Sequence, residues 1–388
     1  MNIIVKKFGG SSVGSIDKIK KIAENIALEK DKQTADTQFV VVVSAMEKTT
    51  DKLFDLAHQI SAHPNQRELD MLVTAGERIT IALLSLALQE KGIQSISFTG
   101  SQSGIITDNS HGNAKILTVN AFRIPQELSK NKLVIVAGFQ GVSLEKEITT
   151  LGRGGSDTTA VSLACYLNAQ KCEIFTDVKG VYSADPRIVK DAIIIKNLSY
   201  EEMLFLALTG SKVLHSRAAE FAQKYNIPLE IKSSFENCEG TMITQHMEES
   251  YVKAISHKDC LKKITITENK KLNLPYFKTE IFEMEYYDNK SLFFIDSKYE
   301  QQFVDEILDC ELQPVTDTEL YAIISLLGYR ICKDIQFFNN LKKLLDDTCK
   351  ENFIIKNQGI GVSIVLNSKD FNQIIQVLHK KYLISECV

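Results

Sequence analysis

The chain has 388 residues, 44% of them hydrophobic, which is enough for real cores and predicts two or three domains. Its net charge of −4 gives no reason to expect a nucleic acid or a membrane surface as a partner. The eight cysteines form no CxxC pair and accompany no histidine cluster, as is typical of reduced thiols in a cytoplasmic protein. The N-terminus MNIIVKKFGG lacks the features of a signal peptide, and no apolar run reaches the ~18 residues of a membrane span.

Short buried strands and amphipathic helices alternate over roughly the first 245 residues. Apolar runs bounded by polar or glycine-rich turns predict strands at 2–5, 39–43, 133–137, 171–175 and 228–231. Helical periodicity predicts helices at 16–29, 51–61, 67–90, 156–168, 199–208 and 214–225. This alternation predicts an α/β domain with an open, mainly parallel sheet sandwiched by helices.

The composition changes after Thr244. Glycine is absent between Gly240 and Gly328, so we place a domain boundary near residue 250, with domains at 1–250 and 251–388. Strands are predicted in the second region at AISH, ITIT, EIFEMEYY, LFFID, LYAIISLLG, FIIKN and GVSIVLN. Helices are predicted at 299–309, 335–349 and 370–382, which gives a smaller α+β region.

A glycine-rich loop, KKFGGSSVG, directly follows the first predicted strand. Glycines let the backbone approach phosphates closely, and the next helix points its N-terminal amides at them. Lys7 is able to supply positive charge to a migrating phosphoryl group. The residue order of a Walker A loop is missing, and a plain tight turn is the alternative for this segment.

A second motif, TLGRGGSDTTA, opens the helix predicted at 156–168. Three glycines surround Arg153, whose guanidinium can grip a carboxylate or a phosphate with two hydrogen bonds. Ser156 or Asp157 is also able to act as a mere N-cap of the helix. Capping does not account for the glycines or the arginine, so this segment predicts an anion-binding site.

Three further segments carry polar groups. FTDVKGVYSADPR follows a buried strand, at the edge where open α/β sheets bind ligands, and the alternative is an ordinary strand-to-helix loop. In LVTAGER, Glu77 either pairs with a substrate ammonium group or is a solvated surface charge. Its neighbour Gly76 costs up to ~1 kcal/mol against alanine in a helix, so it serves packing or ligand approach. The hydroxyls after the second strand, on Ser44 and Thr50, either bind a carboxylate or cap the next helix.

Seven ordered motifs share one resemblance. They are KFGGSSVGS, VVVSAM, LVTAGERIT, GFQG, TLGRGGSDTTA, FTDVKGVYSADPRIV and GSKVLHSRAAEFAQKYNIPLEI. Over roughly residues 2–245 the chain resembles the catalytic domain of aspartokinases, which have the amino-acid kinase fold. The tail resembles, more loosely, the paired ACT regulatory domains of that family. By this likeness the first ACT-like unit covers about 263–315, and the second covers about 251–262 plus 316–388.

The resemblance implies a role for each candidate residue. Lys7 and Asp157 would be catalytic, with Lys7 stabilising the transferring phosphoryl group and Asp157 organising that lysine. Aspartate would be held by Ser44, Thr50, Glu77, Arg153 and Ser156, with Glu77 at its α-ammonium group and Arg153 at a carboxylate. The ATP site would be formed by Lys7, Gly9, Gly10, Ser11, Thr176, Asp177, Tyr182, Arg187 and Lys212.

The implied reaction is ATP-dependent phosphorylation of the side-chain carboxylate of L-aspartate, the entry to lysine, threonine and methionine synthesis. A carboxylate is deprotonated at neutral pH, so no strong general base is required. Catalysis would rest on alignment and on neutralisation by Lys7, helix-end amides and Mg²⁺ carried by ATP rather than by a protein metal site. The alternatives are a related kinase acting on another carboxylate and a non-catalytic amino-acid sensor. The presence of Lys7, Arg153 and Asp157 argues against the sensor.

Three features depart from the family pattern. Ser11 replaces a threonine, and Glu47 stands where the family has a small residue, which adds negative charge near the expected aspartate site. In the first ACT-like unit, residues 264–287 pass from strand to strand through Pro275 with no clear helix. Inhibitory amino acids bind beside that helix in the family, so we predict weak or absent feedback by lysine or threonine. ACT-like units usually pair edge to edge, which predicts a homodimer.

Overall fold

The structure is a computed structural model that describes residues 2–32, 36–248, 250–267, 281–287, 290–349 and 351–384. It divides into two compact units. The first contains Met1–Val181, Ile194–Met203 and Lys212–Met247, and the second contains Tyr182–Ile193, Leu204–Ser211 and Glu248–Val388. Two short segments before residue 250 therefore pack within the second unit, and the domain division given above stays a prediction.

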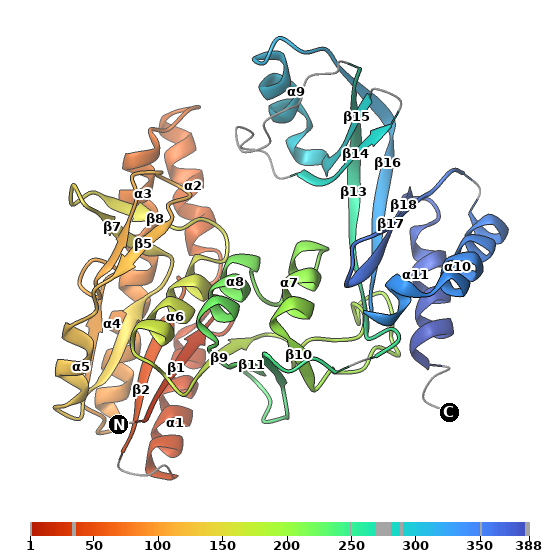
Figure 1. The fold of residues 1–388 in the computed structure, drawn as a ribbon. Helices are drawn as coiled ribbons and strands as arrows, with labels where there is room; N and C mark the ends of the chain where they lie inside the picture. Colours follow the sequence, from red (N-terminus) through yellow and green to blue (C-terminus); the bar gives the residue numbers. More distant parts are fainter. Residues whose placement is uncertain are drawn as a thin grey trace. The chain divides into compact units, whose positions relative to one another are not determined.

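The first unit is built on an eight-stranded sheet in the order β10-β12-β11-β9-β1-β2-β6-β3 (Figure 1). Its strands are β1 (Asn2–Phe8), β2 (Thr37–Val43), β3 (Ser95–Phe98), β6 (Leu133–Ala137), β9 (Lys171–Thr176), β10 (Asn197–Ser199), β11 (Leu229–Ser233) and β12 (Thr241–Thr244). Every neighbouring pair is parallel except β11 and β12. The predicted open, mainly parallel sheet is confirmed.

Helices lie on both faces of this sheet. They are α1 (Ile16–Lys32), α2 (Thr49–Ile60), α3 (Gln66–Val73), α4 (Ala75–Glu90), α5 (Arg123–Leu128), α6 (Gly155–Tyr166), α7 (Tyr200–Leu208), which continues into the second unit, and α8 (Ser216–Tyr225). Because side chains alternate along a strand, Ile4 and Phe8 of β1 join α1 and α4 in one apolar core. Lys7 has the opposite orientation and points to the face covered by α6.

A smaller four-stranded sheet in the order β5-β4-β7-β8 belongs to the same unit. Its strands are β4 (Ile105–Thr107), β5 (Ile116–Val119), β7 (Gln140–Ser143) and β8 (Ile148–Thr150). These strands are only three or four residues long, too short for a clear periodic signal, and they were not predicted from the sequence. Strand β8 runs directly into the turn that carries Arg153.

The helical pattern predicted over 67–90 is two helices, α3 and α4, which meet at Thr74. Among the described residues, Gln66–Glu90 is the stretch long and apolar enough to cross a membrane by length and composition alone, and half of its 18-residue apolar window is buried. It contains the buried carboxyl groups of Asp70 and Glu77. Core helices of soluble proteins pass the same test, and these two helices pack inside the first unit.

The second unit is built on a six-stranded antiparallel sheet in the order β14-β15-β13-β16-β18-β17 (Figure 1). Its strands are β13 (Ala254–Ile266), β14 (Ile281–Tyr287), β15 (Lys290–Asp296), β16 (Pro314–Leu327), β17 (Ile354–Asn357) and β18 (Gly361–Asn367). Its helices are α9 (Glu300–Leu308), α10 (Ile335–Thr348) and α11 (Phe371–His379), with short turns η2 (Ser297–Tyr299), η3 (Arg330–Lys333) and η4 (Lys380–Ile384). The predicted α+β region is confirmed, and its sheet is consistent with ACT domains.

Two predicted strands, AISH and ITIT, form the single strand β13. It pairs with β16 over most of its length, with a bulge around Cys260, whose φ is 55°. Positive φ is uncommon for residues other than glycine, so the continuity of β13 through this point could not be seen in the sequence.

Two apolar cores lie along these long strands. One gathers Ile264, Phe293 and Phe303 beside α9, and the other includes Ile324 and Phe371 beside α10 and α11. Figure 1 shows α9 near one end of β13 and β16, with α10 and α11 near the other end. The predicted helix loss around Pro275 falls on 268–280, which lie outside the described residues.

Candidate functional site

Lys7 lies near the C-terminal end of β1 and is paired with the first turn of α6. Its Nζ lies 2.6 Å from Oδ1 of Asp157, and the two side chains are 12% and 11% exposed. This oxygen makes no aligned hydrogen bond, so the pairing is one of charge. The helix dipole also favours an anion at this end of α6. The ammonium group of Lys7 is therefore held in place but keeps the ability to donate to a second anion.

The loop after β1 presents backbone rather than side chains beside this lysine. The amide of Gly9 donates to the carbonyl oxygen of Phe175, at 3.3 Å. A Cβ on Gly9 would lie 3.5 Å from Nζ of Lys7, and one on Gly10 would lie 3.1 Å from the carbonyl oxygen of Ala45. Glycine keeps this space open, and the chemistry of the loop fits a polyanionic phosphate chain.

Ser44 follows β2 and meets the start of α6. Its Oγ donates to Oγ of Ser156, at 3.0 Å. Gly138, directly after β6, closes the other side, where a Cβ would lie 2.6 Å from the Ser156 hydroxyl oxygen. The two hydroxyls therefore lie at the same sheet edge as Lys7, one residue along α6 from Asp157.

Glu77 lies in the first turn of α4 and is only 2% exposed, so it is not a solvated surface charge. Its Oε1 accepts from the amide of Ala45 at 3.1 Å, while its Oε2 is buried without a hydrogen-bond partner. Gly76 permits the close approach, because a Cβ there would lie 2.8 Å from Cβ of Ala45. Burial raises the pKa of Glu77 to about 7, although backbone hydrogen bonds oppose the shift. A ligand cation would satisfy this oxygen.

The C-terminal ends of β1, β2 and β6 thus bring together a cation, two hydroxyls and two buried acids. The sequence profile described as "Amino acid kinase family" matches residues 2–233. The chain belongs to the amino acid kinase family. The resemblance inferred from the ordered motifs is therefore confirmed at the level of the family and fold.

Individual members of the family can be compared in more detail. The chain is 52% identical to the aspartokinase of Geobacillus stearothermophilus over 269 residues, which are 69% of this chain and 65% of that relative. The match therefore spans just under two thirds of the relative's length. The structure of E. coli aspartokinase III in complex with aspartate and ADP (R-state) matches with a TM-score of 0.84 at 23% identity, covering 99% of this chain and 100% of that one. The same enzyme in complex with lysine and aspartate (T-state) matches with a TM-score of 0.75 at 22% identity, covering 98% and 99%. At these identities the two structures show a shared fold.

Two predicted aspartate ligands, Arg153 and Thr50, lie close to the starts of α6 and α2. Arg153 is exposed in the turn before α6, between Gly152 and Gly154, whose φ values are 72° and 66°. A Cβ on Gly154 would lie 2.2 Å from the His215 side chain, so the turn requires glycine there. Thr50 lies, partly exposed, in the first turn of α2. Their contacts with aspartate stay predictions.

The predicted nucleotide residues are shared between the two units. Thr176 ends β9 and its Oγ1 donates to Oδ1 of Asp177 at 3.1 Å, next to the strand whose loop contains Gly9 and Gly10. Ser11 is partly exposed in that loop, and Lys212 is exposed after α7.

Tyr182 and Arg187 belong to the second unit. There Nη2 of Arg187 lies 2.6 Å from Oδ2 of Asp185, in a side chain that is 78% exposed. A nucleotide site that includes both these residues and Thr176 stays a prediction.

A buried charge cluster on the other face of β1 was not singled out from the sequence. Nζ of Lys6 lies 2.8 Å from Oε1 of Glu29 and also pairs closely with Glu173, which is 2% exposed. Lys171 and Lys232 are further partners of Glu173. Burial alone would raise the pKa of Glu173, but the charge of Lys6 and the hydrogen bonds from Lys171 and Lys6 outweigh it and lower that pKa to about 2. The alternation of side chains along β1 could have indicated this cluster, because it puts Lys6 on the same face as the buried Ile4 and Phe8.

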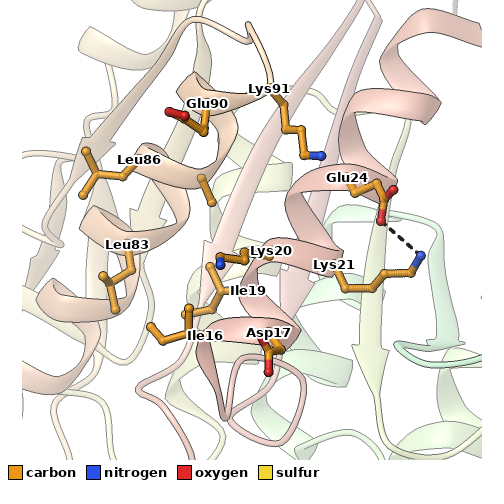
Figure 2. Close-up of a pocket in the computed structure, with 11 residues that line it drawn as sticks. Ile16, Asp17, Ile19, Lys20, Lys21, Glu24, Leu83, Leu86, Glu90 and Lys91 are labelled. Atoms are coloured by element: carbon orange, nitrogen blue, oxygen red, sulfur yellow. Dashed lines mark hydrogen bonds and ion pairs between the residues drawn. The ribbon is translucent and has the colours of Figure 1, made fainter.

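A pocket of about 620 Å³ lies between α1 and α4 and contains none of the predicted site residues (Figure 2). It is lined by Ile16, Asp17, Ile19, Lys20, Lys21, Glu24, Leu83, Leu86, Ala87, Glu90 and Lys91. These helices cover the face of the sheet opposite to Lys7, so the pocket is separate from the site. In the described part of the chain, no three His, Cys, Asp or Glu side chains gather as metal ligands.

Proposed function

We propose that this chain is an aspartokinase of the cytoplasm, which transfers the γ-phosphoryl group of ATP to the side-chain carboxylate of L-aspartate. The product would be 4-phospho-L-aspartate, the first step toward lysine, threonine and methionine. One observation carries the proposal: the Lys7–Asp157 pair and the buried, unpartnered oxygen of Glu77 lie at one edge of the same sheet. A phosphoryl group requires a cation, and an amino-acid acceptor requires an anion for its ammonium group. The names of the relatives support the same activity.

The acceptor is held by charge and hydroxyl groups. The α-ammonium group of aspartate pairs with Oε2 of Glu77, which has no hydrogen-bond partner within the protein. Because Glu77 is buried, this ion pair is stronger than it would be in water. Arg153 clamps a carboxylate with two hydrogen bonds, and Ser44 and Ser156 donate hydroxyl hydrogens beside it. Thr50 completes this side of the site. The side-chain carboxylate then faces the γ-phosphate already deprotonated, so no residue is required as a general base.

The phosphoryl side is organised by β1 and α6. Lys7 neutralises the charge of the transferring group, while Asp157 keeps the lysine aligned and the amides at the start of α6 add positive potential. The glycine loop at Gly9–Gly10 accommodates the phosphates, with Thr176, Asp177, Tyr182, Arg187 and Lys212 completing the nucleotide site. Mg²⁺ arriving with ATP would add further neutralisation.

Regulation and assembly complete the proposal. E. coli aspartokinase III has been solved with lysine. For this chain we propose weak or absent inhibition by lysine and threonine, because Pro275 interrupts the segment where the family has a helix.

We also propose a homodimer formed through the ACT-like units at about 263–315 and at 251–262 plus 316–388. Activity at millimolar lysine or threonine tests the first point, which strong inhibition at low concentration would refute, and sedimentation tests the second.

The activity is tested by coupled ADP release with aspartate, glutamate, N-acetylglutamate and UMP as acceptors. We expect turnover with aspartate to exceed that with each of the others. Preference for any other acceptor would overturn the assignment, and ATP hydrolysis independent of all four would leave it without support.

A further inference from the structure

The buried carboxylate of Asp70 in α3 accepts hydrogen bonds from two chain segments, and no sequence motif pointed to it. It is 1% exposed and lies outside the residues assigned to substrates. Its Oδ1 accepts from the hydroxyl of Thr150 at 2.6 Å and from the amide of Gly112 at 3.1 Å. Its Oδ2 accepts from the amide of Thr150 at 3.1 Å and from Nδ1 of His111 at 2.8 Å. Two separate chain segments are therefore tied to one carboxylate.

The two segments continue into contact with the turn at 151–154, here called the Arg153 turn. Thr150 is the last residue of β8, and its carbonyl oxygen accepts from the amide of Ala114 at 2.8 Å. On the other segment, a Cβ added to Gly152 would lie 2.8 Å from Oδ1 of Asn113. The turn therefore packs directly on residues that follow the Asp70 ligands.

A second contact fixes the outer side of the Arg153 turn. The Nη1 of Arg217, from α8, donates to the carbonyl oxygen of Leu151 at 3.0 Å. Its Nη2 donates to Oδ1 of Asn113 at 2.6 Å. The Arg153 turn is thus held at its start by Thr150 and along its side by Asn113. Asp70 is hydrogen-bonded to both of these segments, through Thr150 in one and Gly112 in the other.

We propose that Asp70 is a positioning residue that sets the backbone of the Arg153 turn, and thereby aims the Arg153 guanidinium at the acceptor carboxylate. The inference rests on the proposed function, because it assigns Asp70 to the acceptor side of that site. Both oxygens of Asp70 are occupied by His111, Gly112 and Thr150, so the inference gives it no contact with either substrate. Its loss should therefore weaken the use of aspartate more than the use of ATP, which is held by β1 and β9.

The matched test uses two neighbouring threonines of β8. Thr150→Val removes the hydroxyl that donates to Asp70, whereas Thr149→Val removes a hydroxyl that pairs with Thr107 at 2.6 Å. Both changes keep a β-branched residue on the strand and remove one buried hydrogen bond. We expect Thr150→Val to raise the aspartate KM about threefold to tenfold with the ATP KM nearly unchanged, because small misplacements of a positioning group are costly. Equal effects of the two variants, or an equal rise in both KM values, would overturn the inference.

A stronger variant and a second readout separate this inference from the proposed function. Asp70→Ala should raise the aspartate KM by about tenfold or more, with Glu68→Gln on the exposed side of α3 as its control. Hydrogen exchange of the peptide covering residues 150–155 should be faster in Thr150→Val than in Thr149→Val. Equal exchange of this peptide in the two variants would contradict the positioning role of Asp70, whichever acceptor the enzyme phosphorylates. If wild type fails to use aspartate while the exchange difference is found, only the proposed function falls.

Discussion

Lys6 and Lys7 are neighbours on β1, yet the two faces of the sheet place them in different electrostatic surroundings. Lys6 is 1% exposed, contacts the carboxylates of Glu29 and Glu173, and has the ring of Phe39 4.8 Å from its Nζ. Lys7 is 12% exposed, and its described ion pair is with Asp157 alone. The same side chain is thus enclosed on one face and accessible on the other.

The difference separates a structural cation from the one that we propose acts on the phosphoryl group. An ammonium group has three donor hydrogens, and at Lys6 the oxygens of two carboxylates take them. Lys7 is paired with a single described oxygen, which fixes its position without using all its donors. A lysine that the protein leaves incompletely paired at a sheet edge is available to an incoming phosphate. Four experiments test this contrast and the site around it.

The largest effect is expected from Lys7→Ala. Loss of the cation should lower kcat by about 10³-fold or more, since charge neutralisation is the main catalytic device in phosphoryl transfer. ATP binding, measured by calorimetry, should persist because the glycine loop and the other nucleotide residues are intact. Turnover near the wild-type value would remove Lys7 from the mechanism.

Lys6→Met should act on stability instead. It leaves the buried Glu173 short of its main partner, so the free energy of unfolding in urea should fall by about 3 kcal/mol. The kcat of the folded variant should stay near wild type. The double variant Lys6→Met, Glu173→Met should recover most of the loss, because it removes the stranded charge as well. A fall in kcat comparable to that of Lys7→Ala would erase the distinction between the two lysines.

Arg153→Ala should mainly raise the aspartate KM, by about tenfold to a hundredfold, the usual effect of losing hydrogen bonds to a charged group. The ATP KM should change little. Arg67→Ala, which removes a half-exposed arginine paired with Glu68 and Glu147, is the matched control and should leave both constants unchanged. An unchanged aspartate KM in Arg153→Ala would count against the clamp.

The pH dependence of aspartate binding should report Glu77. Because its pKa is raised to about 7, Glu77 is largely protonated at pH 6 and ionised at pH 8, and only the ionised form attracts the ammonium group. The aspartate KM should therefore rise about tenfold from pH 8 to pH 6.

In Glu77→Gln that slope should vanish, leaving a high KM at both pH values. The raised pKa of Glu77 has the opposite effect on the stability of the protein without aspartate, which falls rather than improves as the pH rises. A buried acid with a raised pKa stabilises the fold below its ordinary pKa, and this contribution is lost as the pH rises through about 7. A wild-type KM that does not vary between pH 6 and pH 8 would contradict the role of Glu77.

The parts of the site that could be predicted are those where backbone requirements leave a sequence mark. Strand β2 is buried at all seven positions and reads as a continuous apolar run, and the glycine loops stand out by composition. Gly76 was interpreted as serving packing or ligand approach, which its close contact with Ala45 supports, but the burial of Glu77 was left open between two interpretations. The meeting of Ser44 with Ser156, which are 112 residues apart, follows from strand order rather than from any local pattern.

The parts that could not be predicted are polar groups in apolar positions. Asp70 lies in RELDML, where an acid in a helical segment resembles an exposed one, and its ligands come from distant segments. Lys6 directly follows the apolar run at 2–5, and its partners come from α1 and β9. Hydrophobic periodicity carries no information on such pairings, because the partners are set by the tertiary fold.

The long strands of the second unit have a consequence for the chain's architecture. β13 has 13 residues and contributes to both of these apolar cores, with Ile255 in one and Ile264 in the other, and it pairs over most of its length with the 14 residues of β16. Removal of β14, β15 and α9 would leave Leu261–Ile266 of β13 paired with β16 alone, and a two-stranded ribbon is marginal in water. Truncated or fused variants should therefore keep the six strands of the second unit together.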